Sequence, residues 1–467
     1  MSLQESGSII FFGDSLTDNG NLFGLAQSTL PPEIYALFGG PTGAISNGPT
    51  WASYTADLLG LTEDNRAYAD AEALGSRDFG DLVAANGLTD ALLVAADDPI
   101  LDTPIDFAAQ IDAALAPDAS DALVGNIAVV LIGGNDYLEL TPTPANIAAA
   151  RAAITDETLA AASDLAQAGT QTVWVSELPV ATFFPALEGP GSALAIATFD
   201  AHNAALADGV TELQAQGLDV EILHMGAITE AIAHDPGGFG LVAPYDQTLN
   251  ESDVTQDFEA DQVAFYDSVH PSTATHGIMG AFAAFEIDGG TVIENGTSEG
   301  DLYTLGADDE FLATLDGSDA VRAVGGDDIL VGGTGADSLL GGVGQDMISG
   351  GTDGDFISGG HGADILGGQS GNDLILGRSG DDVLIHDGLG LDTLRGGDDD
   401  DTFIFNPVAG NDGAVIRGGS GHDTLYVIAT DQSGLDIQGV EDIIFLDTLA
   451  PLTTETWFEA ADLWGMV

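Results

Sequence analysis

Short, continuous apolar runs separated by alanine-rich stretches fill the first 290 residues of the chain. Four of these runs predict β-strands: Ser8–Phe12, Ile127–Ile132, Thr172–Val175 and Val220–Leu223. The segment Ala148–Ala168 has helical periodicity and is followed by Gly169, a residue that often ends helices. Apolar strands that alternate with helices are typical of a parallel sheet covered on both faces. We therefore expect an α/β fold with reactive side chains just beyond the carboxyl ends of its strands.

A nine-residue pattern replaces this organisation from about residue 296. Aspartate recurs in one phase, with an apolar residue two positions later, and double glycines open the best-preserved units, such as Gly332–Leu340. The aspartates of this phase are Asp328, Asp337, Asp346, Asp355, Asp364, Asp373 and Asp382, followed after a one-residue slip by Asp392 and Asp401. One isolated unit follows at Gly418–Tyr426. Since glycine permits left-handed turns, the pattern predicts a coil of turns and short strands with a narrow Leu/Ile core.

The distribution of glycine places the domain boundaries. Of the 63 glycines, 32 lie between Thr291 and Thr430, which is less than a third of the chain. We therefore expect three parts: an α/β domain at residues 1–290, a glycine-rich coil at 291–430, and a tail at 431–467. A disordered acidic linker is the alternative for the coil, but a linker has no reason to keep aspartate and Leu/Ile in one phase.

Charge excludes several classes of function. The chain of 467 residues has 76 Asp and Glu against 7 Lys and Arg, a formal net charge of −69. Phosphate backbones and acidic headgroups repel such an anion, so we expect no nucleic-acid partner and no polybasic membrane attachment. No run of 18 apolar residues and no N-terminal secretory pattern is present, so we expect no transmembrane segment. With no cysteine, disulfide and thiolate chemistry are excluded.

Candidate hydrolytic residues follow two of the predicted strands. Ser15 lies in the turn Gly13–Gly20, and Asn135 lies in Gly133–Asp136, so both would reach the same edge of the sheet. Serine needs a base to become a nucleophile, and Asp267 precedes His270 by three residues, a spacing that can orient an imidazole. Taken one at a time, these motifs could equally be a plain turn, a chance pair and a helix cap.

Together with neighbouring blocks, these residues resemble the GDSL (SGNH) family of serine esterases and lipases over about the first 285 residues. The blocks that carry the resemblance are Phe11–Asn21, Ser46–Pro49 with Trp51, Ile132–Tyr137, Val175–Pro179, Phe199 to Asn203, and Tyr266–Pro271 with His276. The resemblance implies an α/β/α sandwich that hydrolyses carboxylic esters of lipid, lysophospholipid or short-chain type, with no cofactor for catalysis.

The resemblance also implies a role for each matching residue. Ser15 would be the nucleophile, His270 the general base and acid, and Asp267 the partner that orients the imidazole. The backbone N–H of Ser15 and the side-chain amide of Asn135 would bind the oxyanion. A further backbone donor would come from Ala71 or Glu72, where this chain departs from the family's glycine block. His276 is the alternative base, whereas His202, His224 and His234 are interpreted as surface or packing residues, and Asp14, Asp18 and Asn19 as residues that shape the nucleophile turn.

The nonapeptides resemble the repeats of RTX proteins, which form a parallel β-roll with Ca²⁺ between adjacent turns. Carboxylates in a row repel one another unless a cation neutralises them, and oxygen ligands suit Ca²⁺. The resemblance implies several structural calcium ions held by the nine aspartates from Asp328 to Asp401 named above, with the backbone carbonyls of Gly333, Gly335, Gly342, Gly344, Gly360 and Gly362. The earlier units Gly296–Thr304 and Thr314–Arg322 lack the double glycine and would continue the coil without good calcium sites.

The RTX resemblance further implies secretion from a Gram-negative bacterium by a type I secretion apparatus, with the enzyme released or held at the cell surface. The tail Val440–Val467 would be the secretion signal or a cap on the coil. Three alternatives to an esterase stay open: a polysaccharide deacetylase, an acyltransferase using the same serine, and a non-catalytic calcium-binding adhesin or matrix protein with a decayed hydrolase domain.

Overall fold

The computed structural model divides the chain into two compact units. One comprises Met1–Glu230 and Ala243–Asp288, and the other comprises Ala231–Val242 and Gly289–Val467. The structure describes residues 7–29, 46, 49–69, 71–74, 76–85, 99–117, 119–138, 140, 142–187, 192–234, 236–239, 241, 264–265, 269–293, 295–386, 390–405, 414–427 and 435–445. The predicted signal or cap in the tail falls mostly outside these residues.

The first unit is built on a five-stranded sheet in the order β2-β1-β3-β4-β5, with every neighbouring pair parallel. The strands are β1 Ser8–Gly13, β2 Thr62–Asn65, β3 Ile127–Leu131, β4 Val173–Ser176 and β5 Val220–Leu223. Ile9, Ile10, Phe11 and Phe12 are all fully buried, because β1 lies between β2 and β3 and is covered on both faces. The four predicted strands are confirmed. The polar edge strand β2 was not predicted, since its sequence TEDN has no apolar run.

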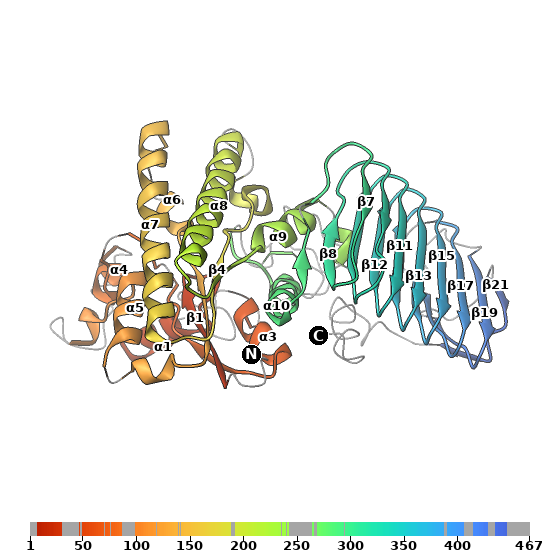
Figure 1. The fold of residues 1–467 in the computed structure, drawn as a ribbon, viewed down its shortest axis with the longest axis horizontal. Helices are drawn as coiled ribbons and strands as arrows, with labels where there is room; N and C mark the ends of the chain where they lie inside the picture. Colours follow the sequence, from red (N-terminus) through yellow and green to blue (C-terminus); the bar gives the residue numbers. More distant parts are fainter. Residues whose placement is uncertain are drawn as a thin grey trace. The chain divides into compact units, whose positions relative to one another are not determined.

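Helices cover both faces of this sheet (Figure 1). The helices up to residue 288 are α1 Asn21–Thr29, α3 Trp51–Leu58, α4 Phe79–Ala85, α5 Phe107–Leu115, α6 Gly134–Leu138, α7 Pro144–Ala168, α8 Ser192–Ala215, α9 Met225–His234 and α10 Thr273–Asp288, and the division between the units falls within α9, after Glu230. On one face, Phe12 and Val130 pack with residues of α5, α7 and α8 in a single core. On the other face, Phe11 meets Trp51 of α3 edge to face, and α3 packs against α10. The α/β/α sandwich expected from the sequence is therefore confirmed.

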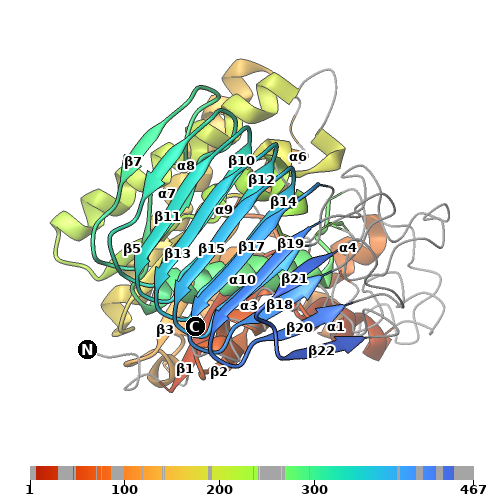
Figure 2. The ribbon, with the colours of Figure 1, turned by 90° about the vertical axis from the view of Figure 1, so that its right-hand side faces the viewer.

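The second unit is a parallel β-roll whose strands alternate between two sheets. The nine-stranded sheet has the order β22-β20-β18-β16-β14-β12-β10-β8-β6, and the eight-stranded sheet has the order β21-β19-β17-β15-β13-β11-β9-β7. Leu330 pairs with Ile348 in one sheet and Leu339 with Ile357 in the other, so one turn of the coil takes two nonapeptides. Figure 2 shows these strands side by side.

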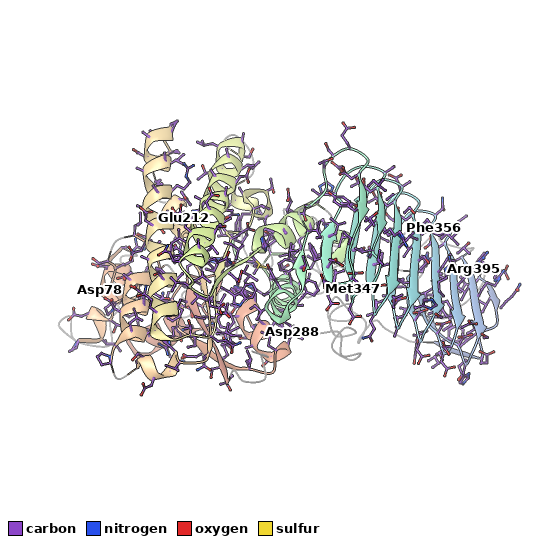
Figure 3. All side chains as sticks on the ribbon, in the orientation of Figure 1. Asp78, Glu212, Asp288, Met347, Phe356 and Arg395 are labelled. Carbon is purple, nitrogen blue, oxygen red and sulfur yellow. The ribbon has the colours of Figure 1, made fainter. Side chains whose placement is uncertain are left out.

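The interior of the roll is one column of apolar side chains from each sheet, fully buried from Leu312 to Leu425. Figure 3 labels Met347 on β12, Phe356 on β13 and Arg395 on β17, which mark the course of the coil. The strands are β6 Thr291–Val292, β7 Leu302–Thr304, β8 Glu310–Ala313, β9 Ala320–Arg322, β10 Ile329–Thr334, β11 Ser338–Val343, β12 Met347–Thr352, β13 Phe356–His361, β14 Ile365–Ser370, β15 Leu374–Ser379, β16 Val383–His386, β17 Thr393–Asp398, β18 Thr402–Phe405, β19 Val415–Ser420, β20 Thr424–Val427, β21 Asp436–Gln438 and β22 Asp442–Phe445.

The roll extends beyond the limits of the recognisable repeats at both ends. The early units without double glycine form strands β7 to β9 and pair in register, as expected. At the other end, β21 and β22 continue both sheets to Phe445, so the coil passes the predicted boundary at residue 430. In this last turn Ile437 and Ile443 keep the apolar phase although most of the glycines are gone. No helix in the described part of the chain is long and apolar enough to cross a membrane.

The close approach of α3 and α10 gives a matched test of packing. An added Cβ at Gly280 would lie 2.8 Å from the Trp51 carbonyl oxygen, whereas one at Gly277 would lie no closer than 3.8 Å to the Tyr54 ring. We expect Gly280→Ala to lower the free energy of unfolding by about 1–3 kcal/mol through overpacking. Gly277→Ala should raise it by about 0.5–1 kcal/mol, because alanine favours the helix. Denaturant titration followed by tryptophan fluorescence measures both, and equal effects would contradict this packing.

Candidate active site and calcium rows

The turn after β1 presents Ser15 at the carboxyl edge of the sheet. β1 ends at Gly13, where an added Cβ would collide with the carbonyl oxygen of Leu131 on β3. The Asp14 carbonyl then accepts the N–H groups of Thr17 at 3.1 Å and Asp18 at 2.8 Å, which turns the chain sharply. Ser15 lies within this turn, and the structure shows no acceptor for its backbone N–H among the described residues.

Two buried carboxylates hold this turn, as the sequence predicted. Oδ1 of Asp14 accepts the N–H of Leu16 at 3.1 Å. The Asp18 carboxylate accepts four backbone N–H groups, those of Gly20, Asn21, Leu22 and Ala69. The role of Asp14 and Asp18 in shaping the turn is therefore confirmed. Asn19 lies at the periphery and donates to Ser53 Oγ at 2.8 Å.

A residue that was not predicted from the sequence fixes the end of β1 from the side. Gln110 of α5 accepts the N–H of Gly13 at 3.0 Å and donates to its carbonyl at 2.9 Å. Its side chain thus pairs with both polar groups of one glycine next to the nucleophile turn. The only signal in the sequence is a glutamine within the otherwise apolar face of Phe107–Leu115, where it is buried.

His270 meets Ser15 from a loop 255 residues away. Its Nε2 lies 2.9 Å from Ser15 Oγ. The loop is held just before α10, where Ser272 N–H donates to the Ala264 carbonyl at 3.0 Å and Ser46 Oγ donates to the Pro271 carbonyl at 3.2 Å. Asp267, the predicted partner of the imidazole, lies outside the described residues, so its role stays a prediction.

The other predicted alternative, His276, is engaged elsewhere. It is fully buried, and its Nδ1 accepts the N–H of Trp51 at 3.2 Å. Burial lowers the pKa of His276 to about 3. His202 is also buried and pairs with the Tyr137 hydroxyl at 2.9 Å, and burial lowers its pKa to about 4. His224 pairs with Glu286, and His234 with Asp316. Of these rings, the structure places His270 within hydrogen-bond distance of Ser15.

Asn135 lies beside the nucleophile at the start of α6. Its Nδ2 donates to the Ala71 carbonyl at 3.0 Å, which leaves a second amide hydrogen on the same nitrogen. Neighbouring Asp136 holds the same block, because its carboxylate accepts the N–H groups of Ala73 at 2.8 Å and Leu74 at 3.0 Å. The segment that replaces the family's glycine block is therefore tied to the turn that carries Asn135.

This geometry bears on the choice between Ala71 and Glu72 as the further backbone donor to the oxyanion. The Ala71 N–H donates to the Tyr68 carbonyl at 3.1 Å within a turn, which weighs against Ala71 as the donor. Glu72 remains the other candidate. Its carboxylate pairs with Arg77 at 3.0 Å, so the negative charge of Glu72 is partly neutralised.

An apolar pocket opens above Ser15 and Asn135. The open space within it and at its mouth amounts to about 480 Å³. Its polar floor is Asp14, Ser15 and Asn135 with Gly134, and its walls are Leu16, Leu178, Pro179, Phe184, Ala186, Leu187, Phe199 and Val269. The 3-10 turn Pro185–Leu187 supplies Ala186 and Leu187, and the helix α8 supplies Phe199. Such a lining suits a hydrocarbon chain better than a hydroxyl-rich ligand.

In the roll, the aspartates of the repeat are buried, and each accepts a backbone N–H through one carboxylate oxygen. The Oδ1 atom of each accepts the backbone N–H of the acidic residue one turn earlier. For example, Asp355 Oδ1 accepts the N–H of Asp337 at 2.8 Å. The second oxygen is buried without a hydrogen-bond partner among the described residues at Asp328, Asp337, Asp346, Asp355, Asp364, Asp382, Asp401 and Asp423. Burial is the main cause that raises the pKa to about 7 for Asp337, Asp364 and Asp401 and to about 8 for Asp328, Asp346, Asp355 and Asp382.

These residues fit calcium. Each free oxygen faces the first glycine of its turn, where a Cβ at Gly332 would lie 2.5 Å from Oδ2 of Asp337. Carbonyl oxygens of the glycine turns approach the glycines of the next turn closely, as that of Gly333 does at Gly351, where an added Cβ would lie 1.9 Å from it. No three acidic or histidine side chains in the described ranges are placed to hold a metal, so a calcium site here would have to combine carboxylate oxygens with backbone carbonyls. Hard oxygen donors of this kind suit Ca²⁺.

A parallel α/β/α sandwich with a serine and a histidine at one sheet edge, followed by a parallel β-roll, defines a hydrolase-type domain joined to a repeat domain. The family model described as GDSL-like Lipase/Acylhydrolase matches residues 9–282, more than half of the chain. The chain belongs to this family. The RTX calcium-binding nonapeptide repeat (4 copies) matches residues 313–348, 322–357, 349–384, 384–406 and 409–427.

Individual relatives match only in part. The chain is 49% identical over 61 residues to the GDSL esterase/lipase At1g29670 and 42% identical over 60 residues to the GDSL esterase/lipase At2g27360, both of Arabidopsis thaliana. These matches cover 12% of this chain and 16% and 15% of those relatives. Among solved structures, the acetylxylan esterase Axe2 of Geobacillus stearothermophilus aligns over 61% of this chain and 96% of its own, with 15% identity and a TM-score of 0.31. The α/β hydrolase LAE5 from the metagenome of Lake Arreo aligns over 62% and 98%, with 13% identity and a TM-score of 0.32.

Burial of Asp14 predicts a pH dependence of stability. Burial, as the main cause, raises the pKa of Asp14 from 3.8 to about 7, with His270 opposing the shift and Asp136 adding to it. Between about pH 4 and 7 the folded chain then holds a proton that the unfolded chain has lost, so stability falls as the pH rises through this window. We expect the unfolding free energy of the native chain, relative to Asp14→Asn, to fall by up to about 1.4 kcal/mol per pH unit there.

Denaturant titrations at several pH values measure this difference. Asp208→Asn, on the exposed side of α8, controls for the removal of one charge from a very acidic chain. If the difference in unfolding free energy between the native chain and Asp14→Asn did not change with pH, the raised pKa of Asp14 would be contradicted.

Proposed function

We propose that this protein is a secreted, serine-dependent carboxylic ester hydrolase with a calcium-stabilised β-roll. The observation that carries the proposal is the 2.9 Å contact of His270 Nε2 with Ser15 Oγ, on the floor of an apolar pocket beside Asn135. A serine within hydrogen-bond reach of a histidine base is the arrangement that activates a hydroxyl for acyl transfer.

The mechanism follows from these contacts. His270 takes the proton of Ser15 as Oγ attacks the ester carbonyl, and Asp267 orients the imidazole and stabilises its charged form. The backbone N–H of Ser15 and the second amide hydrogen of Asn135 stabilise the tetrahedral oxyanion, together with a backbone N–H of the segment that holds Ala71 and Glu72. His270 then protonates the leaving alkoxide. Water repeats the same steps to release the acid and restore Ser15.

The pocket favours an acyl chain as the bound part of the substrate. Phe184, Leu187 and Phe199 offer apolar surface but no hydrogen-bond partners for sugar hydroxyls, which would lose water on entry. Lipid, lysophospholipid and short-chain acyl esters therefore fit better than a polysaccharide acetate. An acyltransferase would use the same serine and differ only in its acceptor. The contact of His270 with Ser15 argues against a decayed domain in an adhesin.

Calcium is proposed as a structural ion of the roll. Bound Ca²⁺ would neutralise carboxylates that are otherwise buried next to one another, as at Asp355, whose pKa is raised chiefly by burial and further by neighbouring carboxylates. The proposed ligands are the aspartates of the repeat phase between Asp328 and Asp401, with carbonyls of the glycine turns. The RTX repeats also support export by a type I apparatus from a Gram-negative bacterium, and calcium outside the cell would then fold the roll.

Replacement of the nucleophile tests the catalytic assignment. We expect Ser15→Ala to lower kcat/KM for p-nitrophenyl esters by about 10³-fold or more, because no other group forms the acyl-enzyme. Ser163→Ala, on the surface of α7, should leave the rate unchanged. Circular dichroism checks that both variants fold, and a Ser15→Ala enzyme as active as the native one would rule out this mechanism.

Competing substrates separate the rival enzyme classes. We expect acyl esters with chains of several carbons to be hydrolysed with a higher kcat/KM than acetate esters on a glycan, because the longer chain buries apolar surface in the pocket. Acetate release from an acetylated polysaccharide and p-nitrophenyl release from a series of chain lengths measure the two. A clear preference for the polysaccharide would favour the deacetylase.

Chelation tests the metal. At about pH 8 the buried aspartates must ionise, and without a cation the roll should lose its β-type circular dichroism. We expect excess calcium to restore the spectrum, whereas magnesium should not, because Mg²⁺ demands a smaller octahedral site. A spectrum that is indifferent to the chelator would count against calcium in the roll.

A further inference from the structure

The aspartates of the roll form two rows, one on each side of the coil. Row 1 lies in the turns that lead from the nine-stranded to the eight-stranded sheet and comprises Asp337, Asp355, Asp373 and Asp392. Row 2 lies in the turns that lead back and comprises Asp328, Asp346, Asp364, Asp382, Asp401 and Asp423. Within each row, every N–H is accepted by Oδ1 of the next member. Among the described residues, row 1 ends at Asp392, whereas row 2 continues to Asp423.

Asp392 differs from the other carboxylates in what its second oxygen contacts. Oδ1 accepts the N–H of Asp373 at 2.9 Å, as the pattern requires. Oδ2, however, pairs with Nδ1 of His386. Both side chains are fully buried, at 0% and 1% exposure. At Asp355, one of the interior members of row 1, the same oxygen has no hydrogen-bond partner among the described residues.

His386 occupies a level of the coil where earlier turns carry glycine. β14 and β16 pair Gly367 with Ile385, so His386 is the next residue along and stands level with Gly368. Beyond it, His386 pairs with Phe405 and Phe405 with Val427, a column of large side chains instead of glycines. The imidazole stacks on the Phe405 ring at 4.6 Å with planes 9° apart, which fixes its orientation toward Asp392.

The sequence at this point fits the same picture. Asp382 and Asp392 are ten residues apart instead of nine, and His386 falls within the unit that contains the extra residue. A ring nitrogen is not among the oxygen ligands that Ca²⁺ takes, and an imidazole against Oδ2 occupies the space that a bare glycine leaves elsewhere. A buried carboxylate still needs a partner, and His386 is the partner present.

We propose that Asp392 is paired with His386 and is not a calcium ligand, so that row 1 ends in a cap made by the protein itself. This inference rests on the proposed binding of calcium elsewhere in the roll. It departs from the pattern of the repeat, which predicts a metal at every aspartate of the phase. Row 2, whose turns keep glycine at Gly396 and Gly418, would continue to bind calcium past the level at which row 1 stops.

Two isosteric substitutions in row 1 test the proposal. Asp355→Asn and Asp392→Asn each keep the Oδ1 that accepts a backbone N–H and each remove one negative charge. With native mass spectrometry of the full chain in calcium, we expect Asp355→Asn to bind at least one ion fewer than the native chain. Asp392→Asn should bind the same number as the native chain. Loss of an ion in Asp392→Asn equal to that in Asp355→Asn would overturn the proposal.

A measurement on the native chain guards against variants that fail to fold. In crystals soaked with terbium, a calcium substitute, anomalous peaks should appear beside Asp355 and Asp382 and none within about 2.6 Å of Asp392. A peak at Asp392 overturns the proposal by itself and leaves the calcium function intact. A native chain that binds no calcium or terbium anywhere would instead overturn the calcium function, and the present inference with it.

Discussion

Inside each of the two units, carboxylates that accept backbone N–H groups stabilise the structure. With 76 acidic residues and only 7 cationic ones, the chain cannot pair its acids with basic side chains. Asp18 and Asp136 instead bind the N–H groups of the loops that surround the nucleophile turn, and each aspartate of the repeat phase from Asp328 to Asp423 binds an N–H from the adjacent turn of the coil. The same residue type therefore positions a candidate active site in one unit and spaces the coil in the other.

The two units differ in whether both oxygens of these carboxylates have hydrogen-bond partners. Asp18 uses both of its oxygens on four N–H groups, which offset the loss of water around a carboxylate. A roll aspartate such as Asp355 has one oxygen satisfied and the other buried without a hydrogen bond among the described residues. The first arrangement is complete within the protein, whereas the second calls for a cation, and this difference explains why metal dependence is proposed for the roll and not for the hydrolase.

The sequence was sufficient to predict the elements that have a continuous apolar run or a repeat. It was not sufficient to predict contacts between residues that are distant along the chain. The apolar runs of β1 and β3 and the nonapeptide phase predicted the sheet and the coil, because burial on both faces and stacking of equal units leave a periodic record. The strand β2 was not predicted, since an edge strand that is paired on one side only needs no apolar run. The role of Gln110 was not predicted, because a single glutamine in a helix does not indicate which glycine it will contact.

At the candidate site, family motifs located Ser15, Asn135 and His270, while the walls of the pocket came from segments without a motif. Phe184 and Leu187 lie in irregular turns whose packing depends on α8, so the acyl-binding surface became visible only in the fold. The one-residue slip before Asp392 was visible in the sequence, but its pairing with His386 was not. Local sequence records the period of a coil, and the partner of a buried group is set by the register between strands.

That register limits how the roll can change length. Because successive nonapeptides alternate between sheets, a gain of eighteen residues would add one complete turn and leave every later strand in its own sheet. A gain of nine would transfer all later strands to the opposite sheet, among them β16 and β18 with the paired His386 and Phe405. A gain of one can be taken up in a turn, as the ten-residue step to Asp392 shows. Viable length variants of this protein should therefore differ by whole turns or by changes confined to loops.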